Sequence, residues 1–170
     1  IASERAVKMF EEYQKSGGED QVNFARIIDT YASLLRDERR FEESVAASNR
    51  SLTIRRQLAL TSPARWEPEY AISLGAHGIR LRDIGRYAEA KKFIEDGLVL
   101  QRRLARLKPE RFGATFVDAL RMGALLLADV GDYSPAALLI AEAHEVTLTV
   151  SDHRRHRDAG TFGLLDSISK

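Results

Sequence analysis

The sequence predicts an all-α fold, an α-solenoid built from antiparallel helix pairs. The main evidence is a repeat of 46 residues, because the segments RDERRF, RDIGRY and ADVGDY begin at Arg36, Arg82 and Ala128. Two further observations agree with it. Apolar residues recur at i, i+3, i+4 and i+7 within each repeat, and no segment shows convincing strand alternation. A fixed period of about 20 to 50 residues is typical of stacked units that cannot bury their apolar faces alone.

Comparing the chain with itself at this spacing divides it into repeats. Residues 21–66 and 67–112 share 12 identities, and aromatic residues recur at two shared phases. These aromatic sets are Phe24, Tyr70 and Phe116, and Phe41, Tyr87 and Tyr133. We predict one repeat domain over 1–170, with repeats at 21–66, 67–112 and 113–152 and partial units at 1–20 and 153–170. Because partial units stand at both ends, we expect the sequence to be an excerpt of a longer chain.

Each repeat contains two runs with helical spacing. The first run of the first repeat is Phe24, Ile27, Ile28, Tyr31, Leu34 and Leu35. A break at Asp37–Arg40 separates it from a second run that begins at Phe41 and continues to about Leu60. The short turns between runs force neighbouring helices to be antiparallel.

The turn inside each repeat predicts a residue in the left-handed conformation. Gly85 and Gly131 stand there in the second and third repeats, and glycine adopts this conformation without steric cost. Arg39 stands there in the first repeat, so we predict a strained or differently shaped turn.

The connections between repeats contain Pro63 and Pro109. Proline stops the preceding helix, because it lacks an amide donor and restricts the residue before it. We expect Ser151–Asp152 and the basic stretch after it to break the helix in the same way downstream.

Small residues occupy three phases where helices are expected to touch closely. They are Ala32, Gly78 and Ala124 in the first helices, and Ser44, Ala90 and Ala136 with Ser51, Gly97 and Ala143 in the second helices. A large side chain at these places would hold two helices apart and forfeit dispersion contacts.

Composition and motifs exclude several classes of function. The net charge of +1 provides no strong field for nucleic acid or anionic membrane, and the absence of cysteine excludes disulfides and thiolate catalysis. No 18-residue apolar run and no signal peptide is visible, which fits a cytoplasmic protein. Phosphate loops, nucleophile elbows and HExxH motifs are missing. We predict no enzyme, no cofactor and no metal.

The remaining candidate residues have structural interpretations that we favour. His153 and His156 could suggest a metal pair, but no carboxylate or cysteine ligands are arranged around them, so we assign them to a solvated connection. His77 and His144 are interpreted as packing residues. Arg55–Arg56 and Arg102–Arg103 are expected to offset the partial charge at helix ends, with a ridge for an acidic partner as the alternative. The aspartates at the ends of the first helices are expected to close the turn or to pair with an arginine of a neighbouring repeat. They are Asp37, Asp83 and Asp129.

The repeats resemble the tetratricopeptide repeat (TPR), a helix-turn-helix unit. The second repeat matches its pattern at Leu74, Gly78, Leu81, Gly85, Tyr87, Ala90, Gly97, Leu98 and Pro109. The usual unit has about 34 residues, and the longer unit here is similar to kinesin-light-chain-like and sensor-ATPase-associated repeats. The resemblance implies a right-handed superhelix whose first helices line a concave face.

Carried over by phase, the resemblance assigns ten residues to a peptide- or protein-binding concave face. They are Arg26, Asp29, Ser33, Arg36, Ile72, Ile79, Arg82, Asp118, Arg121 and Leu125. The lysine and asparagine clamp of chaperone-binding members is missing, because Asp29, Ser33, Gly75 and Ile79 stand in its place. A chaperone tail is therefore rejected as the ligand.

Three functional hypotheses follow. The leading one is a noncatalytic scaffold that binds a protein or peptide segment of unknown identity on the concave face. The alternatives are a regulatory or sensor module of a larger signal-transduction ATPase or multidomain protein, and a module that self-associates into a homo-oligomer through its repeat ends.

Overall fold

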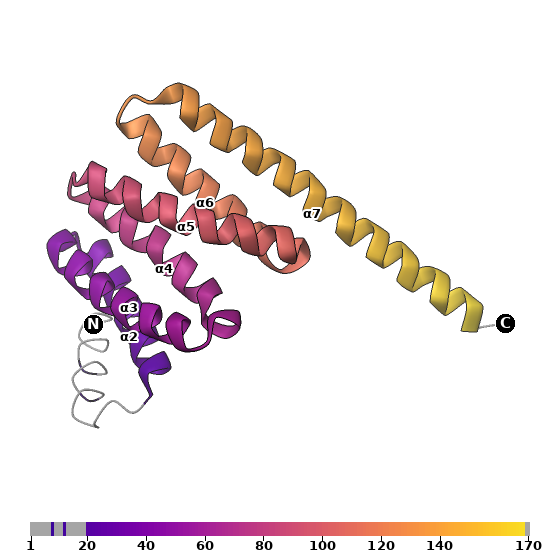
Figure 1. Ribbon diagram of the computed structural model, residues 1–170, viewed down its shortest axis with the longest axis horizontal. Coiled ribbons are helices and arrows are strands. Elements are labelled where there is room, and N and C mark those ends of the chain that lie inside the picture. The colour runs from indigo at the N-terminus through magenta and orange to yellow at the C-terminus, as the bar shows by residue number, and fades with distance from the viewer. Residues whose placement is uncertain (1–7, 9–11, 13–19, 169–170) are drawn as a thin grey trace. The chain divides into compact units, whose positions relative to one another are not determined.

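The computed structural model describes Lys8, Glu12 and residues 20–168, with side chains described as far as Ser151. These residues form α-helices and no strand. Their bounds are α2 Gln21–Asp37, α3 Phe41–Thr61, α4 Pro63–Asp83, α5 Tyr87–Leu107, α6 Pro109–Asp129 and α7 Tyr133–Ile168 (Figure 1). Most of the partial unit expected at 1–20 lies outside the described residues.

The chain divides into two compact units. The unit formed by residues 1–100 contains α2, α3, α4 and most of α5, and α3 packs against both α2 and α4. The unit formed by residues 101–170 contains the last residues of α5 with α6 and α7, which pack side by side (Figure 1). Each unit therefore has its own helix pairs.

The turn that ends each first helix has the same geometry in all three repeats. After α2, the amide of Arg40 donates to the carbonyl of Leu35 (2.8 Å), and the amide of Arg39 donates to that of Arg36 (2.9 Å). The same two bonds recur 46 and 92 residues later, after α4 and α6. This double bond pattern is the Schellman motif, which satisfies the last carbonyls of a helix.

The residue at the centre of this motif has a positive φ in each repeat. The φ angles are 76° at Gly85 and 84° at Gly131, and Arg39 adopts 62° in the first repeat. The predicted left-handed glycines are thus confirmed. Arg39 keeps the shape of the turn and carries the strain, because its Cβ crowds the following carbonyl.

The second helix begins at the same aromatic position in each repeat. Phe41, Tyr87 and Tyr133 are the first residues of α3, α5 and α7. The linker prolines also share a role, since α3 ends at Thr61 just before Pro63, and α5 ends at Leu107 just before Pro109. Each proline is also the first residue of the next helix, where its missing donor costs nothing.

The small residues lie in buried seams, as the sequence predicts. Ser44 donates from Oγ to the carbonyl of Ala32 (2.6 Å), and Ser51 donates to that of Ala25 (3.1 Å). A Cβ added to Gly97 would lie 3.1 Å from the carbonyl of Ala71, which is the contact of Ser51 moved by one repeat. The other members of the three phases are also buried; they are Gly78, Ala90, Ala124, Ala136 and Ala143.

The expected helix break near Ser151–Asp152 is wrong. Helix α7 continues from Tyr133 to Ile168, through the segment where a further first helix was predicted to begin. The connection lacks the proline found at the two earlier repeat boundaries, and polar residues alone do not interrupt the backbone hydrogen bonds of a helix.

Replacing Arg39 by glycine should stabilise the chain. The substitution removes the strain of a left-handed arginine, so we expect the free energy of unfolding to rise by about 1 kcal/mol in urea denaturation. Glu38→Gly, at the neighbouring residue with φ −80°, is the control and should not stabilise. Equal effects of the two changes would contradict this reading of the turn.

Candidate interaction surfaces

The first-helix face of the unit 1–100 carries the residues that the TPR resemblance assigns to ligand binding. Arg26 and Ser33 on α2 are exposed, and Ile72 on α4 is 45% exposed. Ile79 and Arg82, further along α4, are half-buried. These positions lie outside the buried seams, and Arg26, Ser33 and Ile72 are accessible to a ligand.

Two of the predicted residues, Asp29 and Arg36, are held by side chains of other helices. Arg55 of α3 donates from Nε (3.1 Å) and Nη2 (2.5 Å) to one oxygen of Asp29 on α2. Arg36 on α2 binds the carboxylate of Asp83 on α4, and this hydrogen bond raises the pKa of Arg36. The expectation that the helix-end aspartates pair with an arginine of a neighbouring repeat is therefore confirmed for Asp83.

Arg80 completes this set of polar ties, and the sequence analysis missed it. Its side chain is buried, and it bonds Ser44 Oγ from Nε (3.2 Å), Ser33 Oγ from Nη2 (3.0 Å) and the carbonyl of Ala76 from Nη1 (3.0 Å). Burial lowers the pKa of Arg80. The hydroxyl of Ser33 therefore accepts a hydrogen bond from a buried cation, which stabilises the fold whether or not Ser33 also contacts a ligand.

The unit 101–170 carries the other three predicted residues on α6. Asp118, Arg121 and Leu125 are exposed, Leu125 by 53%. Arg121 Nη1 lies 3.9 Å from Asp118 Oδ1, a loose and solvated ion pair. Both side chains line a shallow hollow of about 280 Å³ between α6 and α7, together with Val117 and Thr147. Charge and apolar surface are therefore available next to each other.

The arginines of the second helices do not act on helix ends as expected. Arg55–Arg56 and Arg102–Arg103 lie outside the last turns of α3 and α5. Arg102 instead forms a two-pronged pair with Glu142 of α7, with Nε and Nη2 each 2.8 Å from a carboxylate oxygen. This hydrogen bonding raises the pKa of Arg102 and lowers that of Glu142. Arg102 thus ties α7 to the end of α5.

The two histidines assigned to packing differ. His77 is buried with its ring edge-on to Phe93 at 4.7 Å between centroids, as expected, whereas His144 on α7 is exposed. Burial lowers the pKa of His77 to about 4, and the charges of Arg80 and Arg86 lower it further while Glu89 opposes them. His77 is therefore neutral at pH 7.

The described residues contain neither a metal-binding cluster nor a membrane-spanning helix. These residues contain no group of three or more histidine, aspartate or glutamate side chains placed to hold a metal ion. In the same part of the chain, no helix has the length and apolar character needed to cross a bilayer. His153 and His156 lie beyond the last described side chain.

Comparison with known proteins identifies the fold. No family model matches the chain, and no curated protein matches its sequence. The crystal structure of BtubC (BKLC) from P. vanneervenii aligns with 88% of this chain and 57% of its own, with a TM-score of 0.67 and 15% identity. The chain thus spans little more than half of BtubC. The crystal structure of MamA aligns with 88% of this chain and 81% of its own, with a TM-score of 0.54 and 15% identity.

Both neighbours are TPR-like helical repeats. The chain therefore has the all-α, TPR-like solenoid fold that the 46-residue period and the helical spacing predict. At 15% identity the agreement concerns the fold, and the ligand has to be argued from the surface of this chain.

Proposed function

We propose that the chain is a noncatalytic scaffold that binds a peptide or protein segment along the first-helix faces of its repeats. The observation that carries the proposal is the exposure of Ile72 and Leu125, two aliphatic side chains that lie outside the buried seams. Arg26 and Arg121 are exposed on the same faces. A ligand could bury the aliphatic groups and pair acidic groups with the arginines.

The contacts inside the chain divide the ten predicted residues into two groups. Direct contact with a ligand is proposed for the residues that are exposed or that flank an exposed aliphatic residue: Arg26, Ile72, Ile79, Asp118, Arg121 and Leu125. Asp29, Ser33 and Arg36 would mainly position the helices, because Arg55, Arg80 and Asp83 hold them. Arg82 is half-buried and is proposed to border the face.

A rigid face is the physical advantage of such a surface. The helices of each unit are held by buried seams and ion pairs, so their side chains lose little freedom when a ligand binds. Covering an exposed aliphatic side chain contributes about 1 to 2 kcal/mol. Two such anchors together with charge pairing are enough for a weak, reversible interaction.

The double variant Ile72→Asp with Leu125→Asp tests this proposal. Both side chains are exposed, so the melting temperature should change little, while capture of partner proteins from the native source should fall at least tenfold. Val99→Asp is the matched control, since Val99 is 63% exposed but lies on the second helix α5. Undiminished capture by the double variant, or equal loss with Val99→Asp, would contradict the proposal.

Self-association is a second candidate, and the exposed face of α7 favours it. This face consists of Tyr133, Ala137, Ile140 and His144; Tyr133 is 71% exposed and Ile140 50%. The same phases in α3 include Val45, Ser48 and Leu52, which are all buried because α4 packs against α3. Among the described residues of the unit 101–170, no helix covers the α7 face in this way.

Ile140→Asp tests whether the α7 face joins copies of the chain. If this face joins copies, the molar mass of the parent chain measured by light scattering rises with concentration, whereas the molar mass of the variant stays at the value of a monomer. Leu138→Asp is the control, because Leu138 is 71% exposed but points about 160° away from Ile140 around the helix. A parent chain that is monomeric at every concentration would rule out this candidate.

A further inference from the structure

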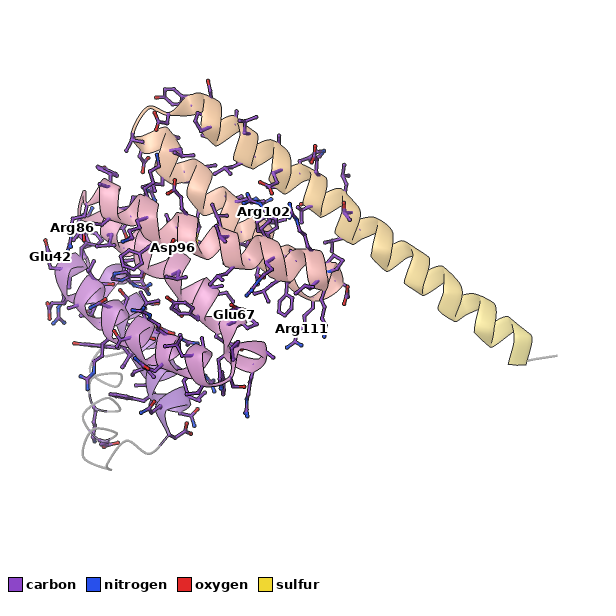
Figure 2. The ribbon with its side chains drawn as sticks, viewed as in Figure 1. Glu42, Glu67, Arg86, Asp96, Arg102 and Arg111 are labelled. Atoms are coloured by element: carbon purple, nitrogen blue, oxygen red, sulfur yellow. The ribbon has the colours of Figure 1, made fainter. Side chains whose placement is uncertain are left out.

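A hollow of about 360 Å³ lies in the unit 1–100, between the second helices α3 and α5 and next to α4. Its exposed rim includes Glu42 and Asn49 of α3 and Glu89 of α5. Its base is formed by the buried side chains of His77 and Leu81 on α4, with Phe93 at one wall. Arg86, a further lining residue just before the start of α5, is labelled near Glu42 in Figure 2.

The hydrogen bonds of Ser48 favour one tautomer of His77. Ser48 Oγ donates its single proton to the carbonyl of Val45 (3.0 Å). The 2.8 Å contact between Ser48 Oγ and His77 Nδ1 fits either group as the donor. Donation by Ser48 to Val45 favours the tautomer in which Nδ1 bears the hydrogen. Because the ring is neutral, Nε2 keeps a lone pair. Within the described residues Nε2 has no hydrogen-bond partner, although His77 is only 4% exposed and lines the hollow.

The hollow thus combines an acceptor at its base, apolar walls and acidic groups at its rim. Glu89 forms a two-pronged pair with Arg86 (2.6 and 2.5 Å), so these two charges offset each other at the rim. Glu42 adds a negative charge in the first turn of α3. A ligand that fits needs an aliphatic stem for Leu81 and Phe93 and a positively charged donor for Nε2 and Glu42.

We propose that this His77 hollow binds a primary ammonium group on an aliphatic chain, such as the side chain of a lysine. The ammonium group donates to Nε2 of His77 and lies near the carboxylate of Glu42, while its methylene groups pack on Leu81 and Phe93. Lysine has this shape and three donors but no acceptor. The His77 hollow is separate from the first-helix face, so the failure of one proposal leaves the other standing.

Nitrogen NMR of the His77 ring in the intact chain tests the first step. Correlation of the ring protons with both nitrogens should show Nδ1 protonated and Nε2 unprotonated at pH 7. Finding the proton on Nε2 would overturn the proposal, because the hollow would then present a donor to the ligand.

A titration tests the ligand. N-acetyl-lysinamide should shift the Nε2 resonance, whereas N-acetyl-norleucinamide, which has the same stem without the ammonium group, should not. Butylammonium distinguishes a free amine from the lysine side chain of a protein. If it binds as tightly as N-acetyl-lysinamide, the ligand is a free amine; if it binds more weakly, the ligand is a lysine within a protein. No shift with either amine, or equal shifts with norleucinamide, would overturn the assignment.

Two glutamates give a matched pair of variants. Glu42→Gln removes the rim charge and should weaken binding of N-acetyl-lysinamide about two- to fivefold. Glu43→Gln is the control, because Glu43 pairs with Arg40 and does not line the hollow. His77→Phe keeps an aromatic ring without the acceptor and should weaken binding about tenfold or more. Unchanged affinity in both Glu42→Gln and His77→Phe would refute the site.

Discussion

The close approach of paired helices at small residues is the constraint on which the rest of the structure depends. Ser44 and Ser51 reach the backbone of α2 directly, and Gly97 brings α5 against the backbone of α4. The 46-residue period places small residues at these positions in all three repeats. The turns after α2, α4 and α6 recur at the same period with the same two hydrogen bonds, which is why one repeat can be used to interpret another.

The interior of the unit 1–100 contains polar ties in addition to apolar packing. Arg80 is buried among hydroxyl and carbonyl oxygens, and His77 bonds Ser48 between α3 and α4. A buried polar group without a partner is costly, so these bonds allow only arrangements that satisfy them all. In the same unit, Asp29 pairs with Arg55, Ser33 accepts from Arg80 and Arg36 pairs with Asp83. We therefore propose the aliphatic residues of the first helices as the main anchors.

Sequence reasoning predicted the features that depend on spacing along the chain. Gly85 indicates a left-handed turn, because glycine adopts that conformation without steric cost. Ala32 indicates a close contact between helices, because its side chain is small. Sequence reasoning did not find the bonds of Arg80 or the pair of Arg55 with Asp29, because these depend on how long side chains cross between helices. It also placed a break at Ser151–Asp152, where polar composition was misread as a helix end.

The central claim is that the seams require small residues, and the stability of Gly97→Leu tests it most directly. Urea denaturation should show a loss of about 2 kcal/mol or more, because the new side chain would push α5 away from the backbone of Ala71. Val99→Leu, an exposed change two residues away on the same helix, should alter stability by less than about 0.5 kcal/mol. A Gly97→Leu chain as stable as its parent would contradict the account.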